Sequence, residues 1–312
     1  TTGLVLMLLF RSCLKRARWM ALGLFAPALC APVFMSPAFI TPVLAQPVNE
    51  IVWTLTPLPP AMVEKDGKIV GYGVDTLDWF IDRLPAYRHK KEIVPLPRLM
   101  QSLTEGGTLC NIGMNKTPER EQILIFSDAV LPHLPVSLVT QTKNDDRLTP
   151  YLDDDDHVDL VRLIKSGKLN GAIRAQRSYG AVVDPILKSF SGNPTMTVIG
   201  TDEQFLPMIT LDRIDWTLYF PAELEYHRRQ KTPDTRFTTW PIAGNDHVIP
   251  ASIACTKTKA GHAVVNDINA LVVEHPEMPW VTFYTASLSQ SDRKRYAREV
   301  RFWQAHKDDI TE

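Results

Sequence analysis

An arginine near the start of a predicted helix is the first candidate for binding chemistry in this sequence. Thr117 and Pro118 are typical of a helix N-cap and of the first helical position. Arg120 then falls in the first turn, where a cation opposes the helix dipole by roughly 0.3–1 kcal/mol at an exposed site. An anion held between the guanidinium group and the free first-turn amides would offset that cost. The alternative is a surface ion pair with Glu121 or Asp128, and such pairs contribute little.

The composition of the chain is that of a globular protein, with 45% hydrophobic and 22% charged residues. A length of 312 residues suits two domains better than one. The 34 basic and 35 acidic residues give a net charge of −1. This balance argues against a nucleic-acid-binding protein, which usually carries a basic face.

The first 45 residues have the layout of a secretory signal peptide. Basic side chains at positions 11, 15, 16 and 18 precede the apolar stretch 19–44. A membrane anchor is the alternative, because this stretch is long enough to span a bilayer. Prolines at positions 27, 32, 37 and 42 disfavour a spanning helix. We therefore expect residues 1–45 to be removed and the mature protein to be periplasmic, without a membrane-spanning segment.

The mature chain alternates between apolar strands and amphipathic helices, a pattern typical of an α/β fold with mainly parallel sheets. Strands are expected over residues 51–56, 92–96, 109–114, 135–140, 171–174, 196–199, 215–220 and 248–256, and residues 236–241 are expected to close the second α/β series. Helices are expected over residues 74–84, 97–103, 158–165, 178–190, 202–211, 222–230, 263–274 and 290–306. Tyr296, Val300 and Trp303 could form a docking stripe on the last helix. The acidic run 153–156 lacks calcium-ligand spacing and predicts a solvated loop.

Several short motifs occur in a fixed order in the first third of the mature chain. They are Pro59-Pro60, Asp66-Gly67-Lys68, Gly71-Tyr72-Gly73-Val74-Asp75, Gly113-Met114-Asn115, Thr117-Pro118-Glu119-Arg120 and Phe126-Ser127-Asp128. In this order they resemble periplasmic solute-binding protein family 3, whose members include polar amino-acid binding proteins. The second half of the chain is similar to that family in its layout more than in its motifs.

The resemblance implies the type II periplasmic binding protein fold, an α/β fold of two lobes. Each lobe would be a mainly parallel sheet with flanking helices, and two crossover strands near residues 138–141 and 240–249 would join them. The implied segments are a signal peptide at 1–45, the first part of lobe 1 at 46–140, lobe 2 at 141–241, and the return to lobe 1 with the C-terminal helices at 242–312.

The resemblance also implies where a ligand would bind. The arginine of the T-x-x-R motif, here Arg120, would grip a ligand carboxylate, with Asn115 and Gly113 at or near the ligand. Ser178 and Tyr179, at a strand–helix junction of the second lobe, would supply further donors. The full predicted ligand-binding set is Tyr72, Gly113, Asn115, Arg120, Ser178, Tyr179, Tyr219 and Phe220.

One position departs from the family pattern. An acidic residue that holds the amino group of the ligand usually follows the strand at 215–220, and here that position is Phe220. An unpaired buried ammonium group is costly, so an α-amino acid is not the expected ligand. Glu223 could substitute for the missing acid. Otherwise aromatic side chains could line a cleft for a flatter or less polar anion.

Cys110 and Cys255 are the two cysteines expected in the mature chain, since Cys13 and Cys30 lie in the predicted signal peptide. A cysteine pair in an exported protein suggests a disulfide. In the implied fold the strand returning from the second lobe lies antiparallel beside strand 109–114, which places Cys255 opposite Cys110. The alternative is two buried free thiols, because cysteine packs well as a small hydrophobe.

The sequence contains no catalytic or nucleotide-binding motif, so we expect no enzyme activity, cofactor or metal site. The predicted function is that of an exported, monomeric receptor that captures a small, carboxylate-bearing anion for an ABC-type transporter. Its expected partners are this small-molecule ligand and an inner-membrane permease. The alternatives are a ligand-sensing module that docks on a membrane signalling partner, and a catalytic derivative of the same fold.

Overall fold

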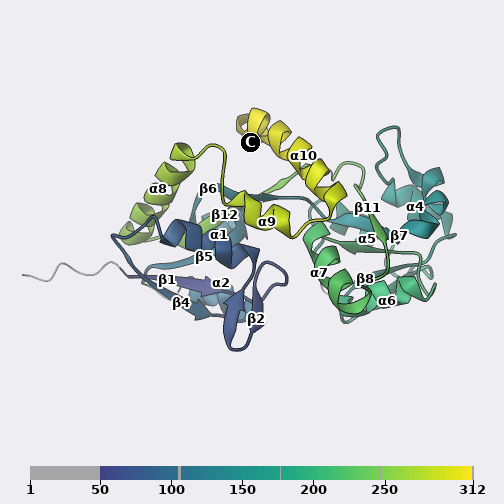
Figure 1. Ribbon diagram of the computed structural model, residues 1–312, viewed down its shortest axis with the longest axis horizontal. Coiled ribbons are helices and arrows are strands. Elements are labelled where there is room, and N and C mark those ends of the chain that lie inside the picture. Colours follow the sequence, from purple (N-terminus) through teal and green to yellow (C-terminus); the bar gives the residue numbers. More distant parts are fainter. Residues whose placement is uncertain (1–49, 105–106, 176, 246, 311–312) are drawn as a thin grey trace, which may run out of the picture. The chain divides into compact units, whose positions relative to one another are not determined.

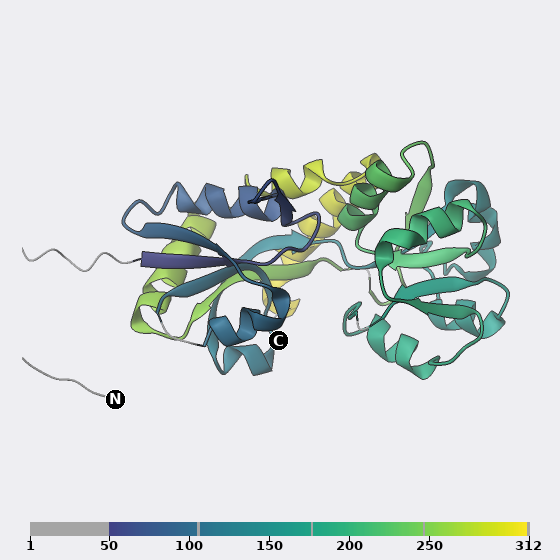
Figure 2. The same ribbon diagram turned by 90° about the horizontal axis from the view of Figure 1, so that it is seen from below.

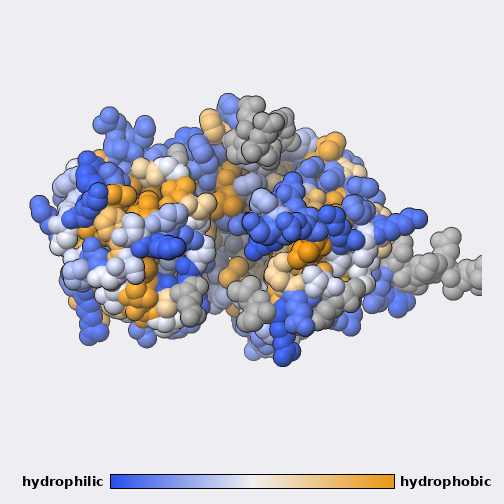
Figure 3. Space-filling model, turned by 180° about the vertical axis from the view of Figure 1, so that it is seen from behind, coloured by the Kyte–Doolittle hydropathy of each residue, from blue (hydrophilic) through white to orange (hydrophobic). Residues whose placement is uncertain are grey.

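The computed structural model describes residues 50–104, 107–175, 177–245 and 247–310, which form two five-stranded sheets with flanking helices (Figure 1). The predicted signal peptide lies outside these residues. Hydrophilic residues cover most of the face shown in Figure 3, with hydrophobic patches between them. No helix in the described ranges combines the length and the apolar character needed to cross a membrane.

The first sheet has the strand order β4-β1-β5-β12-β6. Its strands are β1 (Glu50–Leu55), β4 (Arg88–Ile93), β5 (Leu109–Asn115), β6 (Leu124–His133) and β12 (Ile249–Thr256). Strand β1 runs parallel to β4 and β5, whereas β12 is antiparallel to both β5 and β6. The return strand β12 therefore separates β5 from β6, although β5 and β6 are close in sequence.

Cys110 and Cys255 are directly opposite each other in the register of β5 and β12 and are joined by a disulfide with an S–S distance of 2.07 Å. Both cysteines are fully buried. The bond thus ties the return strand to the centre of the first sheet.

Helices lie on both sides of the first sheet (Figure 2). They are α1 (Tyr72–Ile81), α2 (Leu96–Ser102), α3 (Pro118–Glu121), α8 (Lys259–Glu274), α9 (Val281–Ala286) and α10 (Gln290–Ile310), and a hairpin of β2 (Val63–Lys65) and β3 (Lys68–Val70) precedes α1. Trp280 is fully buried between α1 and the sheet, and its indole N–H donates to the Val130 carbonyl of β6. On α10, Tyr296 and Trp303 are buried in this same core. The predicted docking stripe therefore faces the protein's own interior.

The second sheet has the strand order β11-β7-β10-β8-β9. Its strands are β7 (Ser137–Gln141), β8 (Gly171–Arg174), β9 (Met196–Ile199), β10 (Trp216–Tyr219) and β11 (Phe237–Trp240). Strand β8 runs parallel to β9 and β10, and β7 is antiparallel to β10 and β11. A Cβ atom at Gly171 would lie 2.2 Å from the Trp216 ring, so the two central strands require glycine at this position.

The helical segments of this half are α4 (Leu160–Ser166), α5 (Val183–Ser189), α6 (Phe205–Thr210), α7 (Pro221–Lys231) and the 3-10 turns η1 (Thr142–Arg147), η2 (Thr149–Tyr151) and η3 (Asp202–Gln204). The acidic run forms an exposed turn in which the Asp153 carboxylate accepts from the backbone N–H groups of Asp155 and His157. This geometry agrees with the predicted solvated loop.

Strands β4 and β6 of the first sheet differ from the prediction. Strand β4 spans residues 88–93 rather than 92–96, and its charged sequence RHKKEI lies at the edge of the sheet with much of its surface exposed. The long strand β6 was not predicted, since no element was expected over residues 124–133.

The chain passes from the first sheet to the second over residues 134–136 and returns over residues 241–248. Residues in the first turns of α10 form hydrogen bonds with the strands that flank these two connections. Thr239 of β11 donates to Asp292 at 2.7 Å, and Arg295 donates to the Ser137 hydroxyl at 3.0 Å. Tyr296 donates to the Pro132 carbonyl of β6 at 2.8 Å. Helix α10 is therefore bonded to strands of both sheets.

Candidate functional site

Charged side chains follow each of the three parallel strands of the second sheet. Arg174 ends β8 and Arg177 follows it, Asp202 lies just after β9, and Glu223 lies just after β10. The carboxyl ends of parallel strands meet at one edge of a sheet, and ligands of open α/β folds bind outside that edge. The edge formed by β8, β9 and β10, here called the carboxyl-end edge, is therefore a candidate ligand site.

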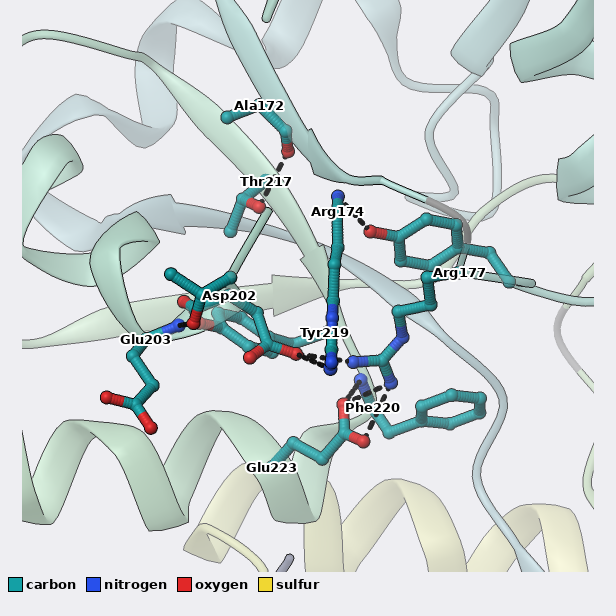
Figure 4. A network of polar contacts seen from close by, with 11 residues as sticks. Ala172, Arg174, Arg177, Asp202, Glu203, Thr217, Tyr219, Phe220 and Glu223 are labelled. Carbon is teal, nitrogen blue, oxygen red and sulfur yellow. Dashed lines mark hydrogen bonds and ion pairs between the residues drawn. The ribbon is translucent and has the colours of Figure 1, made fainter. Parts of the chain in front are cut away.

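The four charged side chains form one network (Figure 4). The Arg177 Nη2 atom donates to both oxygens of the Glu223 carboxylate at 2.7 Å. The Arg177 Nη1 atom donates to Asp202 Oδ2 at 2.8 Å, and Arg174 Nη1 reaches the same oxygen at 3.1 Å. The Arg177 and Glu223 side chains are 14% and 11% exposed, whereas Arg174 is 45% exposed. Arg177 is thus enclosed between two carboxylates, while Arg174 remains at the surface.

Aromatic rings surround the same guanidinium group. The Arg177 Cζ atom lies 5.4 Å from the centroid of the Tyr179 ring and 5.5 Å from that of Phe220. Tyr179 accepts from the Arg174 backbone N–H at 2.8 Å, and Tyr219 donates to the Asp202 carbonyl. Tyr179 and Tyr219 are fully buried, and in this structure each hydroxyl forms its hydrogen bond with a residue of the network.

The pKa shifts follow from burial and from these contacts. Burial tends to lower the pKa of Arg177, but the Glu223 and Asp202 charges outweigh it and the net pKa is raised. Burial raises the pKa of the Glu223 carboxyl, and its contacts with Arg177 oppose that shift. Burial also raises the pKa of Tyr179 to about 12. With both acids ionised, two guanidinium groups balance two carboxylates, and the network is neutral.

Ser178 and Tyr179, the predicted donors of the second lobe, are bonded to a carboxylate of the protein. The Ser178 hydroxyl donates to Asp184 at 2.5 Å, and the Tyr179 backbone N–H donates to the same carboxylate at 2.6 Å. Because Asp184 lies in the first turn of α5, these bonds also hold residues 178–182 outside the helix. Helix α5 therefore begins at Val183 rather than at Ser178.

The predicted ligand residues of the first sheet lie at and just beyond the carboxyl end of β5. Arg120 Nη1 donates to the Asn115 carbonyl at 2.7 Å, and the Thr117 hydroxyl accepts from the Arg120 backbone N–H at 3.4 Å, as expected of an N-cap. Asn115 and Gly113 are exposed, and Arg120 is half-buried. No carboxylate of the described residues forms an ion pair with Arg120, since Glu121 pairs with Lys116 instead. The described part of the chain therefore contains no surface ion pair between Arg120 and Glu121 or Asp128.

Tyr72 begins α1 and its ring packs edge-on against Tyr284, with centroids 5.2 Å apart. The preceding Gly71 has a φ of 129°, and a Cβ atom there would lie 2.5 Å from the Pro60 carbonyl oxygen, which explains the glycine in this motif. Burial raises the pKa of Tyr72, and the Tyr284 and Glu223 charges raise it further. Tyr72 therefore packs on the core of the first sheet.

His133, at the end of β6, contacts an aromatic ring that lies beside the Arg177–Glu223 network. Its ring packs edge-on against Phe220 with centroids 5.7 Å apart, and burial lowers its pKa. The predicted residues thus fall into three groups. Tyr179, Tyr219 and Phe220 lie beside the network of Arg177, Asp202 and Glu223. Tyr72 packs against Tyr284, and Gly113, Asn115 and Arg120 form a group of their own at β5.

Arg174, Arg177 and Asp202 were not among the predicted site residues. The signal that could have identified them is their position, since each ends or closely follows a strand that is parallel to its neighbours. Across the described ranges, no group of three or more His, Cys, Asp or Glu residues is arranged to hold a metal ion.

A family model described as bacterial extracellular solute-binding proteins, family 3, matches residues 51–292. No curated protein matches the chain. Among solved structures, the chain is similar to the probable amino-acid ABC transporter extracellular-binding protein ytmK from Bacillus subtilis. That similarity has 19% identity and a TM-score of 0.57 and covers 78% of this chain and 99% of the other.

Two further structures are similar. One is an ancestral cationic amino acid solute binding protein, at 16% identity and a TM-score of 0.56, covering 77% of this chain and 96% of the other. The other is an amino acid ABC transporter substrate-binding protein from Streptococcus pneumoniae bound to L-arginine, at 16% identity and a TM-score of 0.50, covering 77% and 95%. These likenesses confirm the predicted fold class, the α/β fold of type II periplasmic binding proteins.

Proposed function

This chain belongs to the bacterial extracellular solute-binding proteins, family 3, and we propose that within this family it captures a small, carboxylate-bearing anion. It is a solute-binding protein of the ABC transporter type. In our proposal residues 1–45 direct it to the periplasm, where it acts as a monomer. Its partners are the small solute and an inner-membrane permease.

The charge balance of the candidate site supports an anionic solute. The network at the carboxyl-end edge is neutral, because Arg174 and Arg177 are matched by Asp202 and Glu223. Arg120 is half-buried, and its guanidinium group is oriented by the Asn115 carbonyl rather than by a carboxylate. No carboxylate of the described residues forms an ion pair with Arg120, and a bidentate guanidinium–carboxylate contact is the strongest pairing open to it. This half-buried arginine, without an ion-pair partner in the described part of the chain, is the observation that carries the proposal.

Replacing Arg120 by alanine should weaken solute binding at least about tenfold, which corresponds to about 1.4 kcal/mol. The melting temperature of the empty protein should change little, because Arg120 makes one side-chain hydrogen bond and no ion pair within the described residues. The solute is first recovered from natively exported protein and identified by native mass spectrometry. Its affinity for each variant is then measured by calorimetry.

Lys116→Ala is the matched control for Arg120→Ala. It removes a neighbouring cation whose exposed side chain already pairs with Glu121 at 2.9 Å. Its affinity should stay within about twofold of the unmodified protein, since exposed pairs contribute little. If Arg120→Ala bound the solute as tightly as the unmodified protein does, Arg120 would not be part of the binding site.

Common polar amino acids should stabilise this protein weakly or not at all. Phe220 lies where the family pattern places an acid for the amino group of the ligand, and a phenyl ring cannot accept that charge as a carboxylate does. A bound ligand stabilises the folded state by RT ln(1 + [L]/Kd), so a thermal-shift screen reports binding directly. Glutamine, histidine and arginine are the test compounds, and the solute recovered from the native protein is the positive control. A large rise in melting temperature with any of these three amino acids would contradict the proposal. It would indicate that Glu223 holds the amino group of the ligand.

A further inference from the structure

The Arg177 guanidinium group is held by the same kinds of contact that hold a bound cation. Two carboxylates accept from it, one of them at two equal distances of 2.7 Å, and two aromatic rings lie within 5.5 Å of its central carbon. Carboxylates and aromatic faces are the groups with which proteins bind organic cations. Arg177 therefore occupies a complete cation subsite, formed by Asp202, Glu223, Tyr179 and Phe220.

This subsite does not depend on Arg177 for its shape. Glu223 lies in the first turn of α7, and its carboxylate accepts from the Phe220 backbone N–H at 3.3 Å. Tyr179 is fixed by the Arg174 backbone N–H, and Asp202 also accepts from Arg174. The groups that contact Arg177 are thus held by backbone bonds or by other side chains. Removing the arginine should leave them in place.

The subsite also lies beside solvent. Phe220 is half-buried and Arg174 is exposed, and both border the Arg177 side chain at the carboxyl-end edge. A solute that reaches this edge would meet a subsite that already holds a cation.

We propose that Arg177 is a built-in cation that fills this subsite and thereby excludes solutes carrying an ammonium or guanidinium group. This proposal deepens the proposed function and rests on it for the capture of a small solute, while the carboxyl-end edge is a candidate ligand site because its parallel strands end there. Arg177 is then the residue that determines specificity against organic cations, including amino acids.

The energetic reason is competition within one molecule. A tethered guanidinium group is always present at high effective concentration, so a free amine must displace it to reach Glu223. An amine that bound without displacing it would add an uncompensated positive charge to a neutral network. Without Arg177, Asp202 would keep only the exposed Arg174 as an ion-pair partner and the buried Glu223 would lose its own, and leaving a buried charge unpaired is strongly unfavourable. A free cation of suitable size would relieve that cost.

The test replaces Arg177 by alanine and supplies the missing group as methylguanidinium chloride or ethylammonium chloride in the millimolar range. Thermal shift and calorimetry report binding, against sodium chloride at the same ionic strength. Arg177→Ala should bind methylguanidinium at least about tenfold more tightly than the unmodified protein does. The double variant Arg177→Ala/Glu223→Gln should lose this gain, because the anion that attracts the cation is gone.

Arg174→Ala is the matched control, since it removes a guanidinium group from the same network but leaves Glu223 paired with Arg177. It should show no gain. If the alanine variant does not fold, Arg177→Gln retains a donor for Glu223 and should show a gain in the same direction. An equal response of the Arg177 variant and the unmodified protein would overturn the proposal, as would strong binding of either cation by the unmodified protein. These outcomes do not depend on Arg120→Ala, which tests the proposed function separately.

Discussion

Replacing Trp280 by alanine should lower the free energy of unfolding by about 3–5 kcal/mol. The Trp280 side chain is fully buried and lies 4.5 Å from the Trp79 ring and 4.8 Å from the Phe80 ring, measured between centroids. Its removal leaves a cavity in the core of the first sheet and deprives the Val130 carbonyl of its N–H donor. Transfer, cavity and hydrogen-bond costs then add. Urea denaturation should show a lower midpoint at an unchanged m value.

Phe283→Ala serves as the control for this substitution. Phe283 lies in α9, one turn from Trp280, but is 36% exposed. Its loss should cost less than about 1 kcal/mol, as is usual for substitutions near the surface. If the two variants unfolded at the same urea concentration, burial of the indole ring would not be a main source of stability in this core.

Loss of the Cys110–Cys255 disulfide should lower the free energy of unfolding by about 2–5 kcal/mol. The two cysteines are separated by 145 residues, and the loop-entropy relation gives a constraint on the unfolded chain of about 5 kcal/mol for a loop of that size. The double variant Cys110→Ala/Cys255→Ala removes the bond together with both sulfur atoms. In the reduced but otherwise unmodified protein only the bond is lost. The difference in unfolding free energy between this protein and the double variant therefore measures the packing of the sulfur atoms.

Whether the bond forms during export is a separate measurement. Natively exported protein is alkylated without reduction and its mass is determined. The expected mass carries no alkyl group on Cys110 or Cys255. Two alkylated cysteines would show that the natural protein holds them as free thiols, and the predicted loss of stability on reduction would then be absent.

The order of strands and helices was largely predictable from the sequence, because apolar segments of buried strands and amphipathic helices are separated by clear turn signals. Strand β4 was displaced in the prediction for a physical reason. It lies at the edge of its sheet, none of its six residues is buried, and its composition is that of a polar surface. Hydrophobic periodicity is weakest in such strands.

The site was predictable only in part. The motif around Arg120 is local, so sequence order identifies it and the cap at Thr117 forms as expected. Arg177, Asp202 and Glu223 are far apart in sequence and meet only because three parallel strands end at one edge. Spacing along the chain cannot reveal such a meeting. Glu223 was considered as a partner for a ligand amino group, whereas in the structure its partner is an arginine of the protein.

The position of β12 between β5 and β6 has a consequence for a chain that is synthesised from its N-terminus. The five strands of the second sheet are consecutive, so all of them are available once residue 240 has emerged. The strand pairing of the first sheet is completed later, because β5 and β6 do not pair with each other and both pair with β12. Until residue 256 emerges, both strands present open edges and Cys110 has no partner. A product truncated before β12 would thus combine a second sheet with all its strands and an aggregation-prone first half.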